Sequence, residues 1–414
     1  MTRSRMTKPA VALVAVLSLG LASCGEGADK SAEASGEVDC PITIGASISL
    51  TGMFSEQGPE LLKGYEAWVQ EVNDSGGLLG CEVELVHRDD ESDDQTAVAV
   101  YEDYASSGEV DLVVGPFSSK LVIPTSQAVH ENEMLFVLAS GNAPDVFEPG
   151  YDNQFLAALP LASDRPEPLG DWILSLPESE RPATAAYASA DNPFQQATTK
   201  ALREQLEAGG IETVADEVYL EEGTDFAVLA AKIADTEAEL FFGGTNEPEA
   251  AELVRGFGTI GYEPDIVVLE ANHDSFWSDA GEDAQGVMTL LNWAADMPYP
   301  GNDEFLAAYD DAFDAVPTDD VAVFGYAVGQ VLRAAVESVG CADPSADCQR
   351  KLAEHLHASS VETIFGTISW DDVGRPDGIT RMVGQWNDGV LEVVLATDPE
   401  VATVDVVFPW RSEG

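Results

Sequence analysis

The feature that most constrains the fold is a regular alternation of short apolar segments with amphipathic stretches. Strands are expected at Ile42–Leu50, Glu82–His87, Asp111–Val114 and Met134–Ala139. Between them, residues 61–72, 96–104 and 119–130 are expected to be helical, and the first of these carries apolar side chains along one helical face. Strands separated in this way by helices predict a parallel sheet that helices cover.

A second series of the same kind follows Ser163-Asp164-Arg165-Pro166, which we interpret as a crossing point. Its strands are expected at Thr184–Ser189, Thr213–Tyr219, Leu240–Phe242 and Asp265–Leu269, with helices between them, and three helices and three short strands complete the chain. The pattern predicts an α/β fold with two doubly wound parallel-sheet lobes joined by a multi-crossover hinge. We assign residues 40–161 and 290–368 to lobe 1, and residues 162–289 and 369–414 to lobe 2.

The charge of the chain is strongly unbalanced. There are 19 Lys and Arg residues against 75 Asp and Glu residues, which gives a net charge of −56. Such a surface repels nucleic acid, so we exclude that partner. A high-salt habitat and a generally acidic, well-solvated surface both account for this charge.

The first 23 residues have the pattern of an export signal. A basic start (Arg3, Arg5, Lys8) precedes an apolar run that is too short for a normal membrane span. The run ends in Leu21-Ala22-Ser23-Cys24-Gly25, which resembles the lipobox of bacterial lipoproteins and makes Cys24 the expected lipidation site; an ordinary signal peptide is the alternative. Residues 24–39 are poor in apolar bulk and are expected to be a flexible tether. We therefore expect a protein anchored by lipid to the outer face of the cell membrane.

Four further cysteines support an oxidising location. Cys40 and Cys81 directly precede the first two expected strands, so parallel neighbouring strands would place them side by side. Cys341 and Cys348 flank a short loop. Four cysteines can form two disulfides in three ways. We expect the scheme that joins Cys40 to Cys81 and Cys341 to Cys348. The spacings lack a C-x-x-C pair, so a metal site is not expected.

The turn that ends the strand Asp111–Val114 is a candidate binding site. Gly115 and Pro116 stop the strand, and Ser118 and Ser119 stand where a helix begins. Hydroxyls there can cap the helix or help its free N–H groups to hold an anion, and both interpretations fit the sequence. Ligands of open α/β sheets bind beyond the carboxyl ends of the strands, so other turns of the two lobes are expected at the same rim.

Several ordered motifs make the chain resemble the branched-chain amino acid-binding group of type I periplasmic solute-binding proteins, which serve ABC transporters. The resemblance runs from about Ile42 to at least Trp370. The motifs that carry it are Ile44-Gly45 through Ser49-Leu50-Thr51-Gly52, Gly64-Tyr65-Glu66-Ala67, Val72-Asn73-Asp74-Ser75-Gly76-Gly77, Asp89-Asp90-Glu91-Ser92-Asp93, Val114-Gly115-Pro116 with Ser118-Ser119, and Gly243-Gly244. The resemblance implies the type I periplasmic-binding-protein fold, with two hinged lobes that close over a small ligand.

The resemblance also implies roles for residues of lobe 1. Ser119 matches the serine that holds the ligand α-carboxylate, with Ser118 as a cap or a neighbour. Gly141 and Asn142 match the turn that takes the ligand ammonium on a carbonyl and helps the carboxylate, although Asn142 replaces the family's small hydroxyl residue.

Further roles are implied around the rest of the cleft. Phe54 and Gln57 fall in the first loop, near the ligand side chain. Phe194 falls where an aromatic residue of lobe 2 stacks over the ligand. Thr245-Asn246 replaces a frequent tyrosine, so branched-chain specificity does not follow. Glu270 matches the acid that pairs with the ligand ammonium.

We therefore expect an extracytoplasmic lipoprotein that delivers an amino acid or a related small polar ligand to ABC permease subunits, without a cofactor, a metal or catalysis. Two other classes remain open from the sequence. One is a ligand-sensing module for a membrane receptor, and the other is an exported α/β lipoprotein hydrolase. The hydrolase would need a nucleophile beside a histidine and an acid, and the chain has only five histidines.

Overall fold

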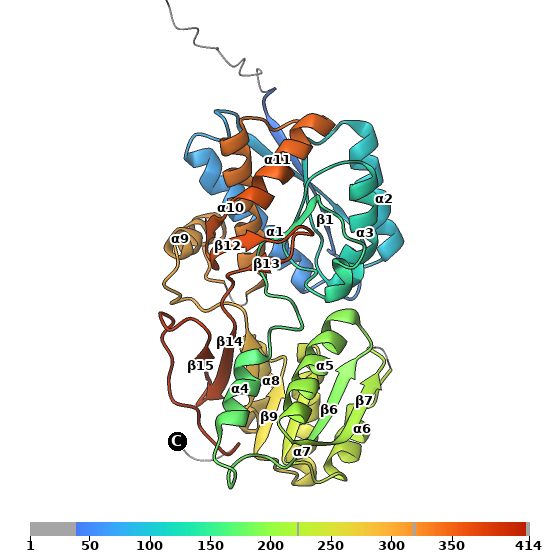
Figure 1. The fold of residues 1–414 in the computed structure, drawn as a ribbon, viewed down its shortest axis with the longest axis vertical. Coiled ribbons are helices and arrows are strands. Elements are labelled where there is room, and N and C mark those ends of the chain that lie inside the picture. Colours follow the sequence, from blue (N-terminus) through green and yellow to red (C-terminus); the bar gives the residue numbers. More distant parts are fainter. Residues whose placement is uncertain (1–38, 222, 318–319, 411–414) are drawn as a thin grey trace, which may run out of the picture. The chain divides into compact units, whose positions relative to one another are not determined.

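The computed structural model describes residues 39–221, 223–317 and 320–410. The predicted signal segment, the predicted lipidation residue Cys24 and most of the predicted tether lie outside these residues. Within the described chain, strands form two large sheets and one small one (Figure 1).

The first sheet is entirely parallel, as the alternation of strands and helices predicts. Its order is β2-β1-β3-β4-β5. The strands are β1 (Ile42–Ile48), β2 (Val83–Asp89), β3 (Leu112–Val114), β4 (Phe136–Leu138) and β5 (Gln154–Leu156).

Helices cover both faces of this sheet. Ile44 of β1 contacts the same small apolar space as Trp68 and Val328, whereas the neighbouring Gly45 faces the ring of Tyr104. Successive strand residues point to opposite faces, so α1 and α10 lie on one face and α2 on the other. The helices of this part are α1 (Gln57–Asp74), α2 (Asp94–Ser107), α3 (Ser119–Glu131), α9 (Asn302–Phe313), α10 (Val321–Val339) and α11 (Ala346–Ala358).

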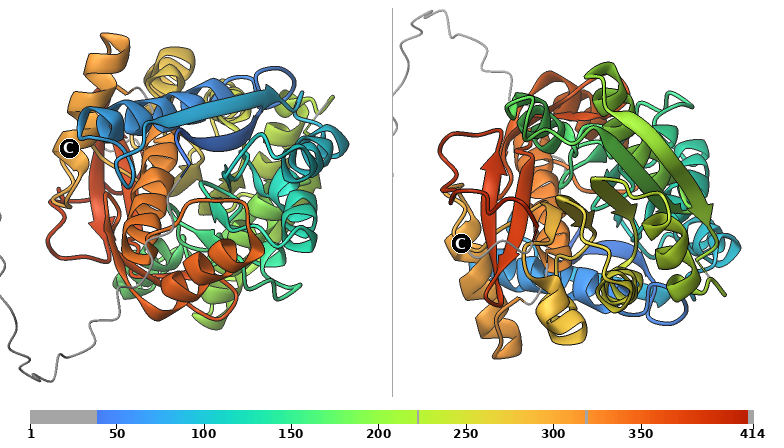
Figure 2. Two further views of the ribbon diagram at one scale, coloured as in Figure 1. Left: turned by 90° about the horizontal axis from the view of Figure 1, so that it is seen from above. Right: turned by 90° about the horizontal axis from the view of Figure 1, so that it is seen from below.

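The second sheet has the order β15-β14-β10-β9-β8-β6-β7. Its strands are β6 (Thr184–Ala190), β7 (Glu212–Tyr219), β8 (Leu240–Gly244), β9 (Ile266–Leu269), β10 (Met288–Leu291), β14 (Met382–Asn387) and β15 (Val390–Ala396). The right-hand view of Figure 2 shows β14 and β15 in red at one edge and β6 and β7 in green at the other. Strand β10 of this sheet ends at Leu291.

The two strands β14 and β15 are antiparallel, unlike the rest of this sheet. They are joined by Asp388 and Gly389, which both have positive φ values, 49° and 85°. An Asp-Gly pair of this kind makes the tight turn whose twist suits a hairpin. A parallel pair of strands would need a much longer connection.

Apolar layers lie on both faces of the second sheet. Phe241 belongs to one buried cluster with Phe257, and the next residue, Phe242, belongs to the other cluster with Tyr187. The covering helices are α4 (Glu167–Ser175), α5 (Pro193–Ala208), α6 (Phe226–Ala234), α7 (Glu247–Ile260) and α8 (Asp274–Ala280). We did not predict α4 and α8, because each is short and follows a segment with loop character.

The chain passes between the two large sheets at three places in its described part. It leaves the first sheet after β5, returns from β10 to α9, and leaves again after the small antiparallel sheet of β11 (Val361–Thr363), β12 (Gly366–Trp370) and β13 (Pro376–Asp377). Trp370 ties the small sheet to β5 because its ring N–H donates to the carbonyl of Leu156 at 2.7 Å.

Two disulfides have the pairing expected from the sequence. Cys40 is joined to Cys81 and Cys341 to Cys348, with Cα atoms 5.2 Å and 6.1 Å apart. In the β1–β2 register Ile42 lies opposite Val83, so the residues that precede the two strands are also neighbours.

Candidate ligand-binding site

The carboxyl ends of strands from both parallel sheets meet at one cavity of about 160 Å³. Its walls include the turns that follow β1, β3 and β4 in the first sheet, and β6, β8 and β9 in the second. A water-sized position needs about 15 Å³, so the cavity holds roughly ten of them, which suits a molecule of amino-acid size. This is the location at which open α/β sheets bind their ligands.

The structure brings together all ten residues that the sequence predicts as ligand contacts. They are contributed by six separate turns, and none lies elsewhere on the protein. The ten are Phe54, Gln57, Ser118, Ser119, Gly141, Asn142, Phe194, Thr245, Asn246 and Glu270.

The turn after β3 places two hydroxyls at the start of α3. Ser118 is the N-cap, and its Oγ accepts a hydrogen bond from the Lys120 backbone N–H at 3.3 Å. Its φ of 75° is rare for a residue other than glycine and is a strained conformation of the kind found at binding sites. The Ser118 N–H donates to Ser140 Oγ at 2.7 Å, which holds the strained turn against the next one.

Ser119 is the better placed of the two to contact a ligand. Its side chain lines the cavity although the residue is only 2% exposed. Its Oγ accepts from the Ala143 backbone N–H at 3.1 Å, so its own hydroxyl hydrogen remains available as a donor. The positive end of the helix dipole and this donor together favour an anionic group.

The turn after β4 approaches α3 closely. Gly141 has a φ of 90°, and a Cβ there would lie 2.7 Å from the side chain of Val122. Only glycine fits both the conformation and the space. The Asn142 side chain donates to the Pro160 carbonyl at 2.9 Å, which anchors the turn to the segment that leaves the first sheet.

The loop after β1 supplies an aromatic wall. Phe54 packs edge-to-face against Phe117, with ring centroids 5.6 Å apart, and both rings line the cavity. The Phe54 backbone N–H donates to Ser92 Oγ at 3.0 Å, so the loop after β2 supports the loop after β1. Phe117 follows β3 in the sequence, next to the predicted serines, but sequence reasoning missed it.

Two acids at the end of β2 hold this loop in place. Asp90 is fully buried and accepts from Ser49 Oγ at 2.6 Å, and burial raises the pKa of its carboxyl. Asp89 accepts from the Thr51 hydroxyl at 2.9 Å. The pKa of Asp89 is lowered, because backbone and hydroxyl donors outweigh the effect of its partial burial.

The second sheet contributes polar groups with unused hydrogen-bonding capacity. Gln195 Nε2 donates to the Thr245 carbonyl at 2.7 Å, which joins the turns after β6 and β8. Gln195 Oε1 and Thr245 Oγ1 are buried and have no hydrogen-bond partner within residues 39–221, 223–317 and 320–410. Buried polar atoms are seldom left unpaired, so these two indicate a place for a polar ligand group or water.

A buried acid shapes the turn that carries Asn246. Glu249 Oε2 accepts from the Asn246 backbone N–H at 2.8 Å and from the Tyr219 hydroxyl at 2.6 Å, as part of a capping box at the start of α7. Burial raises the pKa of the Glu249 carboxyl, and the hydrogen bonds only partly oppose that effect. The pKa of Tyr219 is also raised by burial.

The most consequential residue that sequence reasoning missed as a site residue is Arg165. Its side chain is 3% exposed and lines the cavity. The guanidinium donates to both carboxylate oxygens of Glu270, at 2.8 Å and 3.3 Å. A sequence signal existed, since Arg165 is one of only 19 basic residues and stands at the predicted crossing point.

Other cavity residues had no distinctive sequence pattern. Asn292 accepts from Arg165 Nε at 3.2 Å through Oδ1 and donates to Asp320 at 2.7 Å through Nδ2. Asn192 donates to Glu221 at 2.7 Å. The remaining lining residues outside the sequence prediction include Leu159, Asn272, His273, Val321 and Phe324.

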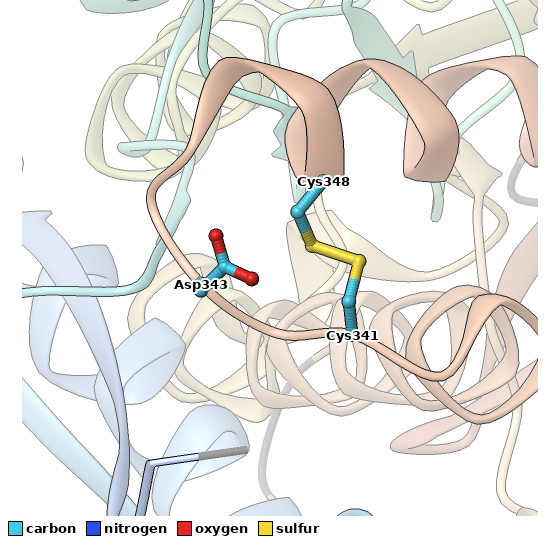
Figure 3. A group of neighbouring side chains, drawn as sticks. All are labelled: Cys341, Asp343 and Cys348. Atoms are coloured by element: carbon cyan, nitrogen blue, oxygen red, sulfur yellow. A yellow bond between two sulfur atoms is a disulfide. The ribbon is translucent and has the colours of Figure 1, made fainter. Parts of the chain in front are cut away.

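A metal centre is not supported by the one candidate group in the described chain. Cys341, Asp343 and Cys348 have ligand atoms within 4.8 Å of one another. Figure 3 shows, however, that the two sulfur atoms are bonded to each other. Disulfide sulfur is not the thiolate that binds metals. In the same part of the chain, no helix has both the length and the apolar character that a membrane span requires.

Comparison with known proteins agrees with this geometry. The model of the periplasmic binding protein family matches residues 41–388. The chain belongs to this family. Among the curated relatives of this periplasmic binding protein is the Leu/Ile/Val-binding protein homolog 3 of Brucella melitensis, which is 26% identical over 355 residues, covering 84% of this chain and 92% of that protein. The family resemblance seen in the sequence is therefore confirmed.

Solved structures confirm the fold. The branched-chain amino acid transporter substrate-binding protein LivJ of Streptococcus pneumoniae, in complex with isoleucine, is 19% identical with a TM-score of 0.73, covering 86% of this periplasmic binding protein and 99% of LivJ. A solute-binding protein of an ABC transporter from R. palustris, in complex with benzoate, is 18% identical with a TM-score of 0.74, covering 88% of this chain and 98% of that one.

Proposed function

We propose that this periplasmic binding protein captures an amino acid or a related small carboxylate in the cavity between its two sheets and delivers it to the permease of an ABC importer. The single observation that carries the proposal is the convergence of six strand-end turns on one cavity that has the Ser118-Ser119 helix start at one wall. The ligand carboxylate would accept hydrogen bonds from the Ser119 hydroxyl and from the Ser119 backbone N–H at the start of α3.

The rest of the cavity supports a ligand with an apolar body. Phe54, Phe117, Leu159, Phe194 and Phe324 all line it. The isoleucine bound by LivJ and the benzoate bound by the R. palustris protein both combine a carboxylate with an apolar part. These two similar structures support the same ligand class here without selecting one member of it.

Binding is tested with the full chain carrying Cys24→Ala, which the predicted lipidation reaction cannot modify. Leucine, isoleucine, valine and benzoate are titrated by isothermal calorimetry, and matched apolar amines without a carboxylate serve as controls. The proposal expects saturable binding of at least one carboxylate and none of the amines. If no carboxylate binds, or if the amines bind equally well, the proposed ligand class is wrong.

The lipid anchor and the transport role have separate tests. Labelled palmitate should be incorporated into the wild-type chain in its host and not into the Cys24→Ala variant. Uptake of the identified ligand should fall when the gene is deleted and recover when it is restored. Unchanged uptake would favour the sensing alternative over transport.

A further inference from the structure

Arg165 and Glu270 form a tightly held ion pair within the cavity wall. The guanidinium also donates from Nη2 to the Leu290 carbonyl at 2.8 Å, and its Cζ atom lies 4.9 Å from the ring centre of Phe194. Arg165 is 3% exposed and Glu270 9%. A bidentate pair with this many supporting contacts is a fixed part of the wall.

The pair changes what Glu270 can offer a ligand. Its carboxylate is the one expected to bind a ligand ammonium, yet both of its oxygens accept hydrogen bonds from Arg165. The positive charge of Arg165 opposes the attraction of Glu270 for a second cation at nearly the same distance. An ammonium group placed there would also face a guanidinium, which has no acceptor to offer it.

We propose that Arg165 is a specificity-determining residue that withdraws Glu270 from ligand recognition, so that the cavity selects small carboxylates by their carboxylate and apolar body and does not require an α-ammonium group. This inference rests on the proposed function, because it assumes that a carboxylate is held at the Ser118-Ser119 turn. The ligand class therefore extends from amino acids to the corresponding acids without the amino group.

Two other acids of the cavity wall each accept a hydrogen bond from an asparagine side chain. Glu221 Oε1 accepts from Asn192 at 2.7 Å, and Asp320 Oδ2 accepts from Asn292 at 2.7 Å. Asn292 also accepts from Arg165 Nε at 3.2 Å, so Asp320, Asn292, Arg165 and Glu270 form one connected network. Arg165 is therefore held by Asn292 at one end of its guanidinium and by Glu270 at the other.

The test compares leucine with 4-methylpentanoate, which has the same carboxylate and apolar body but no ammonium group. The quantity measured is the ratio of their dissociation constants, obtained by calorimetry on the full chain carrying Cys24→Ala. The wild-type cavity is expected to bind 4-methylpentanoate at least as tightly as leucine. Arg165→Gln frees Glu270 and should shift the ratio toward leucine by about tenfold or more, because a charge-assisted bond becomes available.

Two further variants separate specificity from a merely structural role. Arg165→Lys keeps the positive charge and should leave the ratio near the wild-type value. Glu270→Gln should not weaken leucine selectively, because the wild-type carboxylate makes no contact with an ammonium. A purely structural Arg165 would weaken both ligands equally in Arg165→Gln and leave the ratio unchanged, which contradicts the inference.

The outcomes distinguish this inference from the proposed function. If leucine binds more than tenfold tighter than 4-methylpentanoate and Glu270→Gln removes that preference, the inference is overturned while the proposed function stands. If neither carboxylate nor any amino acid binds, the proposed function fails and this inference fails with it. If Arg165→Gln does not fold, the wild-type ratio and Glu270→Gln decide the question.

Discussion

Ser119→Ala is the substitution with the most direct consequence at the cavity. The Ser119 hydroxyl accepts from the buried Ala143 N–H at 3.1 Å, and the substitution leaves that donor without a partner. A stranded buried N–H costs about 1–3 kcal/mol of folding free energy. If Ser119 also donates to a ligand carboxylate, losing that charge-assisted bond removes about 1.5–3 kcal/mol of binding free energy. That loss corresponds to a roughly 10- to 150-fold rise in the dissociation constant.

The same helix contains a matched control. Ser126 is also 2% exposed, but its hydroxyl has no hydrogen-bond partner in the described part of the chain. Ser126→Ala strands no donor, so its effect on stability should stay within about 0.5 kcal/mol and its effect on binding should be negligible. Stability is measured by urea unfolding, and affinity by calorimetry with the tightest ligand of the panel.

The two serines make the reasoning refutable. Ser119→Ala should lose both stability and affinity, and Ser126→Ala should lose neither. Equal losses in the two variants would mean that a buried hydroxyl matters only for packing. Wild-type affinity in Ser119→Ala would show that the turn after β3 does not hold the ligand.

Three more predictions concern a glycine of the cavity wall, a buried acid and a disulfide. Gly141→Ala should destabilise the protein by about 1–3 kcal/mol through its clash with a valine of α3, whereas Gly80→Ala, with a φ of 84° and open space around it, should show only the smaller conformational cost in the same unfolding assay. The raised pKa of Glu249 means that the native state holds this proton more tightly than the unfolded chain does. The stability of the wild type relative to Glu249→Gln should therefore fall as the pH rises from the ordinary pKa of 4.5 to the raised pKa. Urea unfolding at several pH values measures this, and a rise in relative stability over that window would contradict the prediction. Replacing Cys40 and Cys81 together by serine opens a loop with a sequence separation of 41, which should cost about 4 kcal/mol on the chain-entropy estimate, and a loss below about 1 kcal/mol would refute it.

Much of the fold was predictable because its signals are local. The helix α10 begins at Val321 and ends at Val339, as its apolar pattern indicates, and the parallel order of β1 and β2 follows from the helix between them. The antiparallel edge of the second sheet was harder to predict from the sequence. The turn Asp388-Gly389 is a recognisable hairpin signal, but the side of the sheet on which the hairpin pairs depends on contacts with β10, far away in the sequence.

The residues of the cavity also divide into those that the sequence predicted and those that only the structure revealed. Its predicted residues lie at strand ends, where the rule for open α/β sheets directs attention, and the family resemblance narrowed the choice to particular turns. Asn292 follows β10 and Asp320 precedes α10, but none of the family motifs pointed to either residue. Their mutual hydrogen bond exists only because β10 ends near the start of α10.

The Ser118-Ser119 turn and the Arg165–Glu270 pair mark the limit of what the sequence determines by itself. A strand, a stop and a helix start are encoded within about ten neighbouring residues, so the position and polarity of the turn could be derived without coordinates. Arg165 and Glu270 are 105 residues apart, and their pairing depends on how the chain crosses between the sheets and where β9 ends. Only the tertiary structure shows that the acid expected to attract a ligand is already paired with a guanidinium, because electrostatic interactions depend on distance in space and not on separation along the chain.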